Sequence, residues 1–234
     1  MESLLEFARG PLFRISFAIM LLGLGRILFL DLWGLYKAYQ KAGNKKMPWK
    51  LIFDRTLQWF FPIKRFATNR HVYSIFSIIF HIGLIIVPIF LFAHINLWNQ
   101  SIGISWPAIP YWWAFGLSLC VIICGLYMLI TRMTIKPMHF LSRGQDYLWL
   151  ILLLVPFVTG FTCANINISS ATYQFFMLIH VLSGELIFIL IPFTKIAHSV
   201  LMPFSQLIDA LAWKFPPGTD EDVSITLNKK GVPI

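Results

Sequence analysis

Five long apolar stretches constrain what this chain can fold into more than any other feature. Each approaches or exceeds the roughly 20 residues that an α-helix needs to cross the hydrocarbon core of a bilayer. They cover approximately residues 12–33, 72–96, 111–131, 146–165 and 171–200. Only 12% of the 234 residues are charged, against about 25% in an ordinary soluble domain. The sequence therefore predicts an all-α integral membrane bundle of five transmembrane helices.

The basic residues predict the orientation of these helices. The segment 36–70, between the first two spans, carries nine Lys and Arg residues and a single acid. The segments 97–110 and 166–170 carry no charged residue, whereas 132–145 carries three basic ones. Because cytoplasmic loops are enriched in Lys and Arg, we expect the N-terminus outside and the C-terminus in the cytoplasm. The net charge of +9 then reflects topology and does not indicate a nucleic acid partner.

The chain divides into a membrane domain, residues 1–204, and a cytoplasmic extension, residues 205–234. Over 204–215 apolar side chains recur at helical spacing beside charged ones, which predicts an amphipathic helix on the inner membrane surface. The N-terminus is acidic and no signal-peptide cleavage site follows the first apolar stretch, so we expect that span to be retained.

Four of the six histidines lie within the predicted spans. His81 and His94 fall on the second span, and His180 and His198 fall on the fifth. Ionisable residues are expensive in hydrocarbon and are functional candidates by default. Neutral imidazole is a good axial ligand for haem iron, and a helical bundle can enclose a flat apolar macrocycle. These four histidines are therefore candidate metal ligands, although His81 or His94 can instead simply hydrogen-bond to a neighbouring helix.

The directions of the two spans pair the histidines by depth. The second span runs outward and the fifth runs inward, so His94 and His180 share the outer half of the membrane, and His81 and His198 share the inner half. On a regular helix, His180 and His198 lie on one face roughly 27 Å apart. The 13 residues from His81 to His94 leave those side chains roughly 140° apart on an ideal helix. Pro88 lies between them, and a kink there can turn both rings toward the bundle core. The arrangement predicts two b-type haems.

Two motifs carry a resemblance to a known family. The first is Phe80-His81-Ile82-Gly83-Leu84, with a second histidine near the end of the same span. The second runs from Leu178-Ile179-His180 to Ile191-Pro192-Phe193-Thr194-Lys195-Ile196-Ala197-His198. Over approximately residues 72–204 the chain resembles the cytochrome b (gamma) subunit of respiratory nitrate reductase. The resemblance implies five helices, quinol oxidation, and inward electron transfer through two bis-histidine haems with the pairing given above.

The chain departs from the nitrate reductase subunits in two respects. Its interval between His81 and His94 is longer, which looks more like the branch found in sulfate-reducer and heterodisulfide-reductase-type membrane complexes. That likeness implies a cytoplasmic iron–sulfur subunit as partner, possibly with further subunits, and menaquinone as substrate. The outer loops also lack the Lys that the nitrate reductase subunits carry near their quinol site.

Four other charged residues lie within the spans, and each has more than one interpretation. Asp31 and Lys195 are near the inner ends of their spans, where they can snorkel to the membrane surface. Lys195 also lies one turn before His198, and the resemblance implies that it neutralises an inner haem propionate. Arg26 can bind a propionate or pair with Glu185, and Glu185 can instead handle quinol protons.

We therefore expect a cytochrome b subunit of a respiratory redox complex, in the cytoplasmic membrane of a bacterium or archaeon. It would transfer electrons between menaquinone and the iron–sulfur partner, and would not be catalytic alone. Its three cysteines lack the spacing of a zinc or iron–sulfur site. The alternatives are a transporter or channel that uses intramembrane Arg, Glu and His, and a purely structural anchor.

Overall fold

The computed structural model describes residues 1–41, 49–60, 71–198, 201–202, 204–205, 208, 216 and 218–230. All regular secondary structure in these residues is helical. The chain divides into two compact units, which are described separately. The first comprises Met1–Ala18 and Lys64–Ile189, and the second comprises Ile19–Ile63 and Leu190–Ile234.

Five helical segments are long and apolar enough to cross a membrane. They are Glu2–Lys41, Val72–Phe90, Tyr111–Thr134, Gly144–Asn165 and Ser170–Phe193. Large apolar side chains such as Leu22 and Ile123 are exposed along these helices, as expected where lipid replaces water. The prediction of an all-α bundle with five transmembrane helices is confirmed, and the chain is a multi-pass membrane protein.

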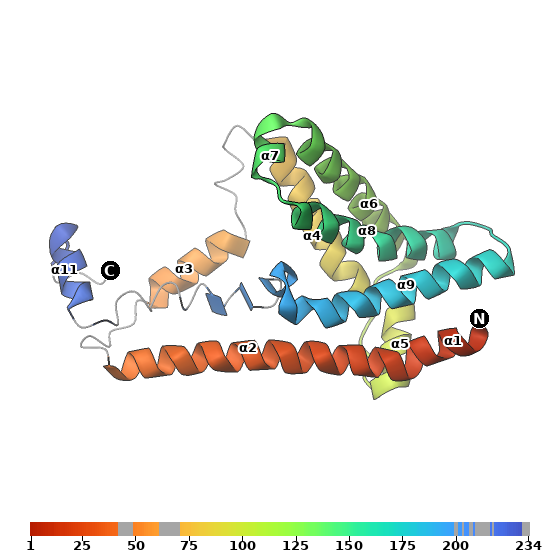
Figure 1. Ribbon diagram of the computed structural model, residues 1–234, viewed down its shortest axis with the longest axis horizontal. Helices are drawn as coiled ribbons and strands as arrows, with labels where there is room; N and C mark the ends of the chain where they lie inside the picture. The colour runs from red at the N-terminus through yellow and green to blue at the C-terminus, as the bar shows by residue number, and fades with distance from the viewer. Residues whose placement is uncertain are drawn as a thin grey trace. The chain divides into compact units, whose positions relative to one another are not determined.

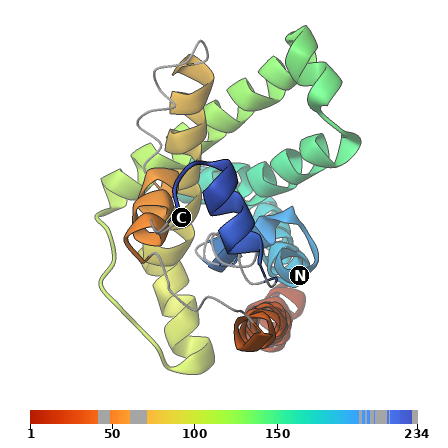
Figure 2. The same cartoon turned by 90° about the vertical axis from the view of Figure 1, so that its left-hand side faces the viewer.

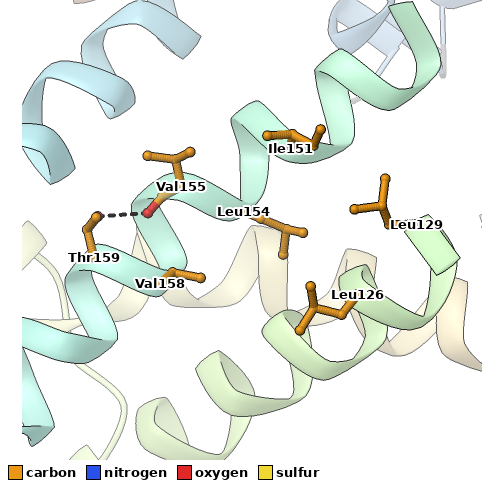
Figure 3. Close-up of a pocket in the computed structure, with 7 residues that line it drawn as sticks. All are labelled: Leu126, Leu129, Ile151, Leu154, Val155, Val158 and Thr159. Carbon is orange, nitrogen blue, oxygen red and sulfur yellow. Dashed lines mark hydrogen bonds between the residues drawn. The ribbon is translucent and has the colours of Figure 1, made fainter. Parts of the chain in front are cut away.

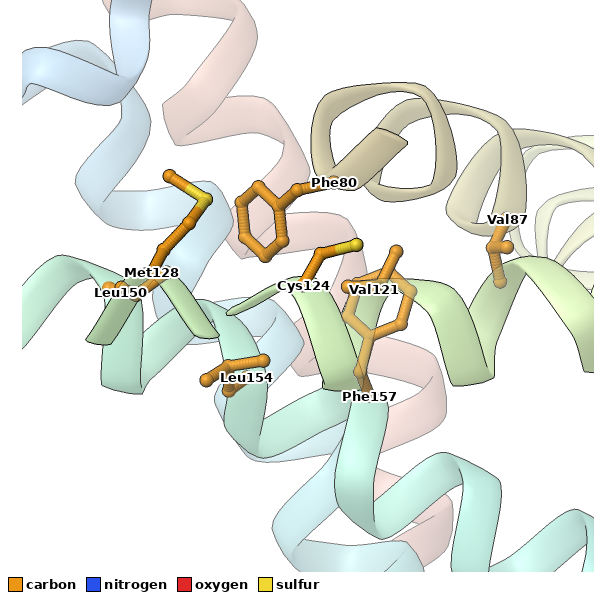
Figure 4. Close-up of a cluster of buried hydrophobic side chains, with 8 residues drawn as sticks. All are labelled: Phe80, Val87, Val121, Cys124, Met128, Leu150, Leu154 and Phe157. Atoms are coloured by element: carbon orange, nitrogen blue, oxygen red, sulfur yellow. The ribbon is translucent and has the colours of Figure 1, made fainter. Parts of the chain in front are cut away.

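Three antiparallel helices form the core of the first unit. They are α4 (His71–Phe90), α6 (Tyr111–Thr134) and α8 (Gly144–Asn165), with the short α7 (Lys136–Leu141) joining the last two (Figures 1 and 2). Figure 4 shows the buried side chains that these helices contribute: Phe80, Val87, Val121, Cys124, Met128, Leu150, Leu154 and Phe157. Cys120 and Cys124 are both free thiols, and Cys124 belongs to this core.

Two glycines allow these helices to approach each other closely. A Cβ at Gly83 of α4 would lie 2.4 Å from Cγ2 of Val121 on α6. A Cβ at Gly125 of α6 would lie 2.5 Å from Cδ2 of Leu154 on α8. Helices in lipid associate mainly by van der Waals packing, and small residues at the contacts bring the backbones together. These two positions therefore hold α6 between α4 and α8.

The second predicted span, 72–96, is two helices instead of one. It is divided between α4 and α5 (Phe92–Ile102), and Leu91 has extended backbone angles, φ −71° and ψ 128°. The expected disruption is thus present three residues after Pro88. The last carbonyls of α4 find partners outside the helix: Pro88 O accepts from His94 Nδ1, Ile89 O from Trp106 Nε1, and Phe90 O from the Ile109 N–H. The break leaves these carbonyls satisfied, as burial in lipid requires.

The rest of the first unit consists of the N-terminal residues and the last long helix of that unit. It contains α1 (Glu2–Phe7), a π-helical turn (Ala8–Leu12), the first residues of α2 (Phe13–Lys41), and α9 (Ser170–Leu190). Gln174 of α9 donates to the carboxylate of Glu2 at 3.4 Å. An aromatic cluster then links α2, α5 and α9 through Phe13, Phe17, Trp98 and Phe188.

The fifth span is not one regular helix to residue 200, which corrects the prediction for 171–200. The α-helix ends at Leu190 and is followed by two 3-10 turns, Ile191–Phe193 and Lys195–Ala197. Pro192 cannot donate a backbone hydrogen bond, and Thr194 is extended with φ −135° and ψ 176°. The estimate of 27 Å along a single helix, and the shared face of His180 and His198, therefore do not apply.

The second unit contains the remainder of α2, α3 (Trp49–Phe60), the two 3-10 turns and α11 (Thr219–Thr226). On α3, the exposed residues Trp49, Phe53 and Leu57 form an apolar stripe at four-residue intervals. The predicted amphipathic helix at 204–215 lies mostly outside the described residues. The polar C-terminal extension contains the helix α11.

Candidate functional site

The structure places two of the four predicted ligands side by side. His94 on α5 and His180 on α9 have ring centroids 5.8 Å apart, and their ring planes differ by 15°. Both rings are half-buried within the first unit. Two helices far apart in the sequence thus present imidazoles to each other, as the depth argument expects for the outer pair.

The hydrogen bonds of both rings fix their tautomers. His180 Nδ1 lies 2.7 Å from Pro156 O on α8, and His94 Nδ1 lies 3.1 Å from Pro88 O on α4. A carbonyl oxygen can only accept, so Nδ1 carries the hydrogen in each ring. In a neutral imidazole the lone pair then resides on Nε2, and this is the common arrangement for a metal-binding histidine.

A glycine on α8 makes room for the ring of His180. A Cβ on Gly160 would lie 2.7 Å from Cε1 and 2.8 Å from Nδ1 of that ring. Both values are shorter than Cβ atoms tolerate, so this glycine is required for the observed position of the ring. Sequence reasoning missed Gly160 because nothing in the chain signals that α8 packs against α9 at this point.

The other two predicted ligands share the same tautomer. His81 Nδ1 donates to Ser77 O at 2.6 Å, and His198 Nδ1 donates to Lys195 O at 2.5 Å. His139, which was not a predicted ligand, differs because its Nδ1 faces the hydroxyl of Tyr147 at 3.1 Å. His81 belongs to the first unit and His198 to the second, so their pairing stays a prediction.

Arg9 is a second residue that sequence reasoning missed. It lies on the π-helical turn before α2, and π-helical turns occur frequently at functional sites. Its guanidinium interacts electrostatically with His180 and with Cys163 of α8, and its carbonyl accepts from the Ser101 hydroxyl at 3.4 Å. The sequence does not indicate that Arg9 lies near His180, because that proximity depends on how the helices pack.

Glu185 is the most deeply buried charged residue of the described chain. It lies on α9 and is only 3% exposed. Neither of its carboxylate oxygens has a hydrogen-bond partner among the described residues.

The remaining charged candidates lie in the second unit. Arg26, Asp31 and Lys195 are all exposed there. Since Arg26 and Glu185 belong to different units, their ion pair stays a prediction, as do the propionate contacts of Arg26 and Lys195.

An apolar pocket of about 300 Å³ lies between α6 and α8 (Figure 3). Its lining is Leu126, Leu129, Ile151, Leu154, Val155, Val158 and Thr159. The only side-chain hydroxyl in this lining, that of Thr159, donates to Val155 O at 2.7 Å. The pocket suits hydrocarbon and offers no free polar group.

These features define a class: a multi-pass, all-α membrane protein with two histidines of different helices paired in its first unit. A curated protein from Nitratidesulfovibrio vulgaris strain Hildenborough is 32% identical to the chain over 151 residues. The match covers 64% of this chain and 66% of that protein, slightly less than two thirds of its length, and its name, "Protein", specifies no activity. No family model and no solved structure matches the chain.

Proposed function

We propose that this protein is a membrane cytochrome b subunit of a respiratory redox complex in a bacterial or archaeal cytoplasmic membrane. It would exchange electrons with menaquinone and with a cytoplasmic iron–sulfur subunit of the heterodisulfide-reductase type. The observation that carries the proposal is the pairing of His94 with His180, both with Nδ1 bonded to a backbone carbonyl.

The dimensions of the pair fit a bis-histidine iron. A metal–imidazole bond is about 2 Å long, and the centre of the ring lies about 1 Å beyond the nitrogen. Two imidazoles that share one metal therefore have ring centroids no more than about 6 Å apart, and the observed separation of 5.8 Å is within that limit.

Haem b, when bound, would supply reversible one-electron chemistry. His94 and His180 would hold the outer haem through Nε2, and the carbonyls of Pro88 and Pro156 would keep each ring in the required tautomer. Arg9 would neutralise a propionate of this haem, because its charge acts on His180. Gly160 would keep the space for the His180 ring.

A second haem b would be held by His81 and His198, with Lys195 and Arg26 as candidate propionate partners. The tautomers of both histidines support this assignment. The basic segments 36–70 and 132–145 would lie on the cytoplasmic side, where they would favour docking of the iron–sulfur partner and contact with anionic lipid. The inner haem would therefore be the one that faces this partner.

A reduced-minus-oxidised absorption spectrum with a pyridine haemochrome assay tests the proposal on the purified chain. We expect about two non-covalent b-type haems per chain, and a loss of about one in His94→Ala but none in His139→Ala. A colourless wild-type protein would refute the proposal and favour the transporter or channel.

A further inference from the structure

Glu185 is buried without any of the partners that a buried carboxyl normally has. Its side chain is 3% exposed, and both oxygens lack a hydrogen bond within the described structure. The hydroxyl of Ser183, two residues before Glu185 on α9, donates to the backbone carbonyl of His180 at 2.9 Å. Burying an unpaired carboxylate costs several kcal/mol. A group that is this costly to retain has a purpose other than stability.

The position of Glu185 relates it to the outer histidine pair. It follows His180 on α9 by five residues, about 7.5 Å along the helix axis and roughly 140° around it, so the two side chains lie on different faces of α9. It precedes Phe188 by three residues, so these two side chains lie on the same face of α9. Glu185 therefore lies between the level of the histidine pair and that of the aromatic cluster.

The aromatic cluster offers faces for a flat ring. Trp98 contacts Phe13, Phe17 and Phe188 with ring centroids 5.3, 4.6 and 6.5 Å away. Trp98 lies one turn after His94 on α5, and Phe188 lies on α9 with His180. Two of the three helices that form the cluster therefore also carry the histidine pair. Phe17, Trp98 and Phe188 are each only half-buried, so part of each side chain is exposed. Aromatic side chains of this kind favour stacking or edge contacts with a planar ring.

We propose that Glu185 is the proton-exchanging residue of a quinone site beside the outer haem, with the quinone ring against the aromatic cluster. The inference rests on the function proposed above and locates its quinone chemistry in the first unit. A lipid-soluble quinol needs a proton acceptor and an electron acceptor, and Glu185 lies about 7.5 Å along α9 from His180, which would hold the outer haem.

Oxidation of one hydroquinone to quinone breaks two O–H bonds and releases two protons and two electrons. Each proton in turn forms an O–H bond on the Glu185 carboxylate and leaves for the aqueous phase before the next is taken. The haem that His94 and His180 would hold would supply the one-electron acceptor for this oxidation. In the direction of quinone reduction, the Glu185 acid donates each proton.

The test compares Glu185→Gln with wild type in lipid nanodiscs, using menadiol as a soluble quinol and dithionite as a reductant that needs no quinone site. We expect unchanged haem content, unchanged reduction by dithionite, and reduction by menadiol slowed about 100-fold, within the 10²–10⁴ range of general acid–base catalysis. Glu185→Asp should recover part of the rate. Glu6→Gln, an exposed change on α1, should behave as wild type.

Redox-induced infrared difference spectra supply a readout independent of rate. A carboxylic acid band that responds to reduction should be present in wild type and absent in Glu185→Gln. Full menadiol activity in Glu185→Gln, or an infrared band that this change leaves in place, would overturn the inference. A third outcome would also overturn the inference: infrared spectra that show an ionised Glu185 in wild type and a protonated Glu185 in Arg26→Gln. The two residues would then form a structural ion pair in wild type. A wild-type protein without haem would instead refute the proposed function.

Discussion

Replacing Gly160 with alanine is the most local perturbation of the outer histidine pair. The new methyl group would lie 2.7 Å from Cε1 of His180, and ordinary van der Waals contact begins near 3.4 Å. The ring therefore has to move by about 0.7 Å, which also disturbs the 2.7 Å hydrogen bond from Nδ1 to Pro156 O.

Two effects of this substitution oppose each other. Alanine stabilises a helix interior by roughly 0.5–1 kcal/mol relative to glycine, so α8 itself should not be weakened. The displaced imidazole, however, loses a hydrogen bond worth about 0.5–1.5 kcal/mol. Loss of such an orienting contact typically lowers metal affinity about 10–100-fold. We expect the protein to fold and insert while the outer haem is weakly held or lost.

The assay is haem stoichiometry together with electron paramagnetic resonance of the oxidised protein in detergent. Gly160→Ala should retain the inner haem in its low-spin state. The outer haem should be lost or converted to high spin. Gly116→Ala on α6 is the matched control, because a Cβ there meets no atom within 4 Å. If Gly160→Ala keeps two haems with wild-type spectra, the ring of His180 is not positioned by Gly160 and the geometry proposed for the outer site is wrong.

Three further predictions concern the haems and the inner surface. His180→Ala should remove the outer haem and His198→Ala the inner one; loss of the same spectral component in both variants would contradict the pairing. Arg9→Gln should lower the midpoint potential of the outer haem, because a nearby cation favours the reduced state, and an unchanged potential would exclude Arg9 from that site. The exposed apolar stripe of α3 predicts that this helix lies on the membrane surface. Spin labels at Phe53→Cys and Asp54→Cys should then report lipid and water respectively, and equal exposure to water at both would refute this placement.

The five spans were predictable because hydropathy and length are local properties of a sequence. Each span needs only about 20 apolar residues in succession, and the chain supplies them without reference to its neighbours. Helix ends were less predictable. The π-helical turn at Ala8–Leu12 and the extended residue Thr194 depend on which carbonyls and side chains come to lie nearby.

The proximity of His94 and His180 was predictable from the sequence, and their surroundings were not. His94 and His180 can be paired by counting residues along two antiparallel spans. Gly160 and Arg9 could not be assigned in this way, because their relevance arises only when α8 and the π-helical turn lie against His180. Glu185 stood out as a charge in a span, but its lack of partners is a property of packing.

The break at Leu91 affects both the direction of the His94 ring and its tautomer. On a continuous helix, 13 residues place His81 and His94 roughly 140° apart. If one of the two side chains faced the bundle core, the other would point away from it. Ending α4 at Phe90 frees α5 to take its own direction, and the first carbonyl left unpaired, that of Pro88, becomes the acceptor for His94 Nδ1. The same discontinuity therefore reorients the ring toward His180 and fixes its tautomer. A substitution that restored a regular helix through Leu91 would remove both effects at once.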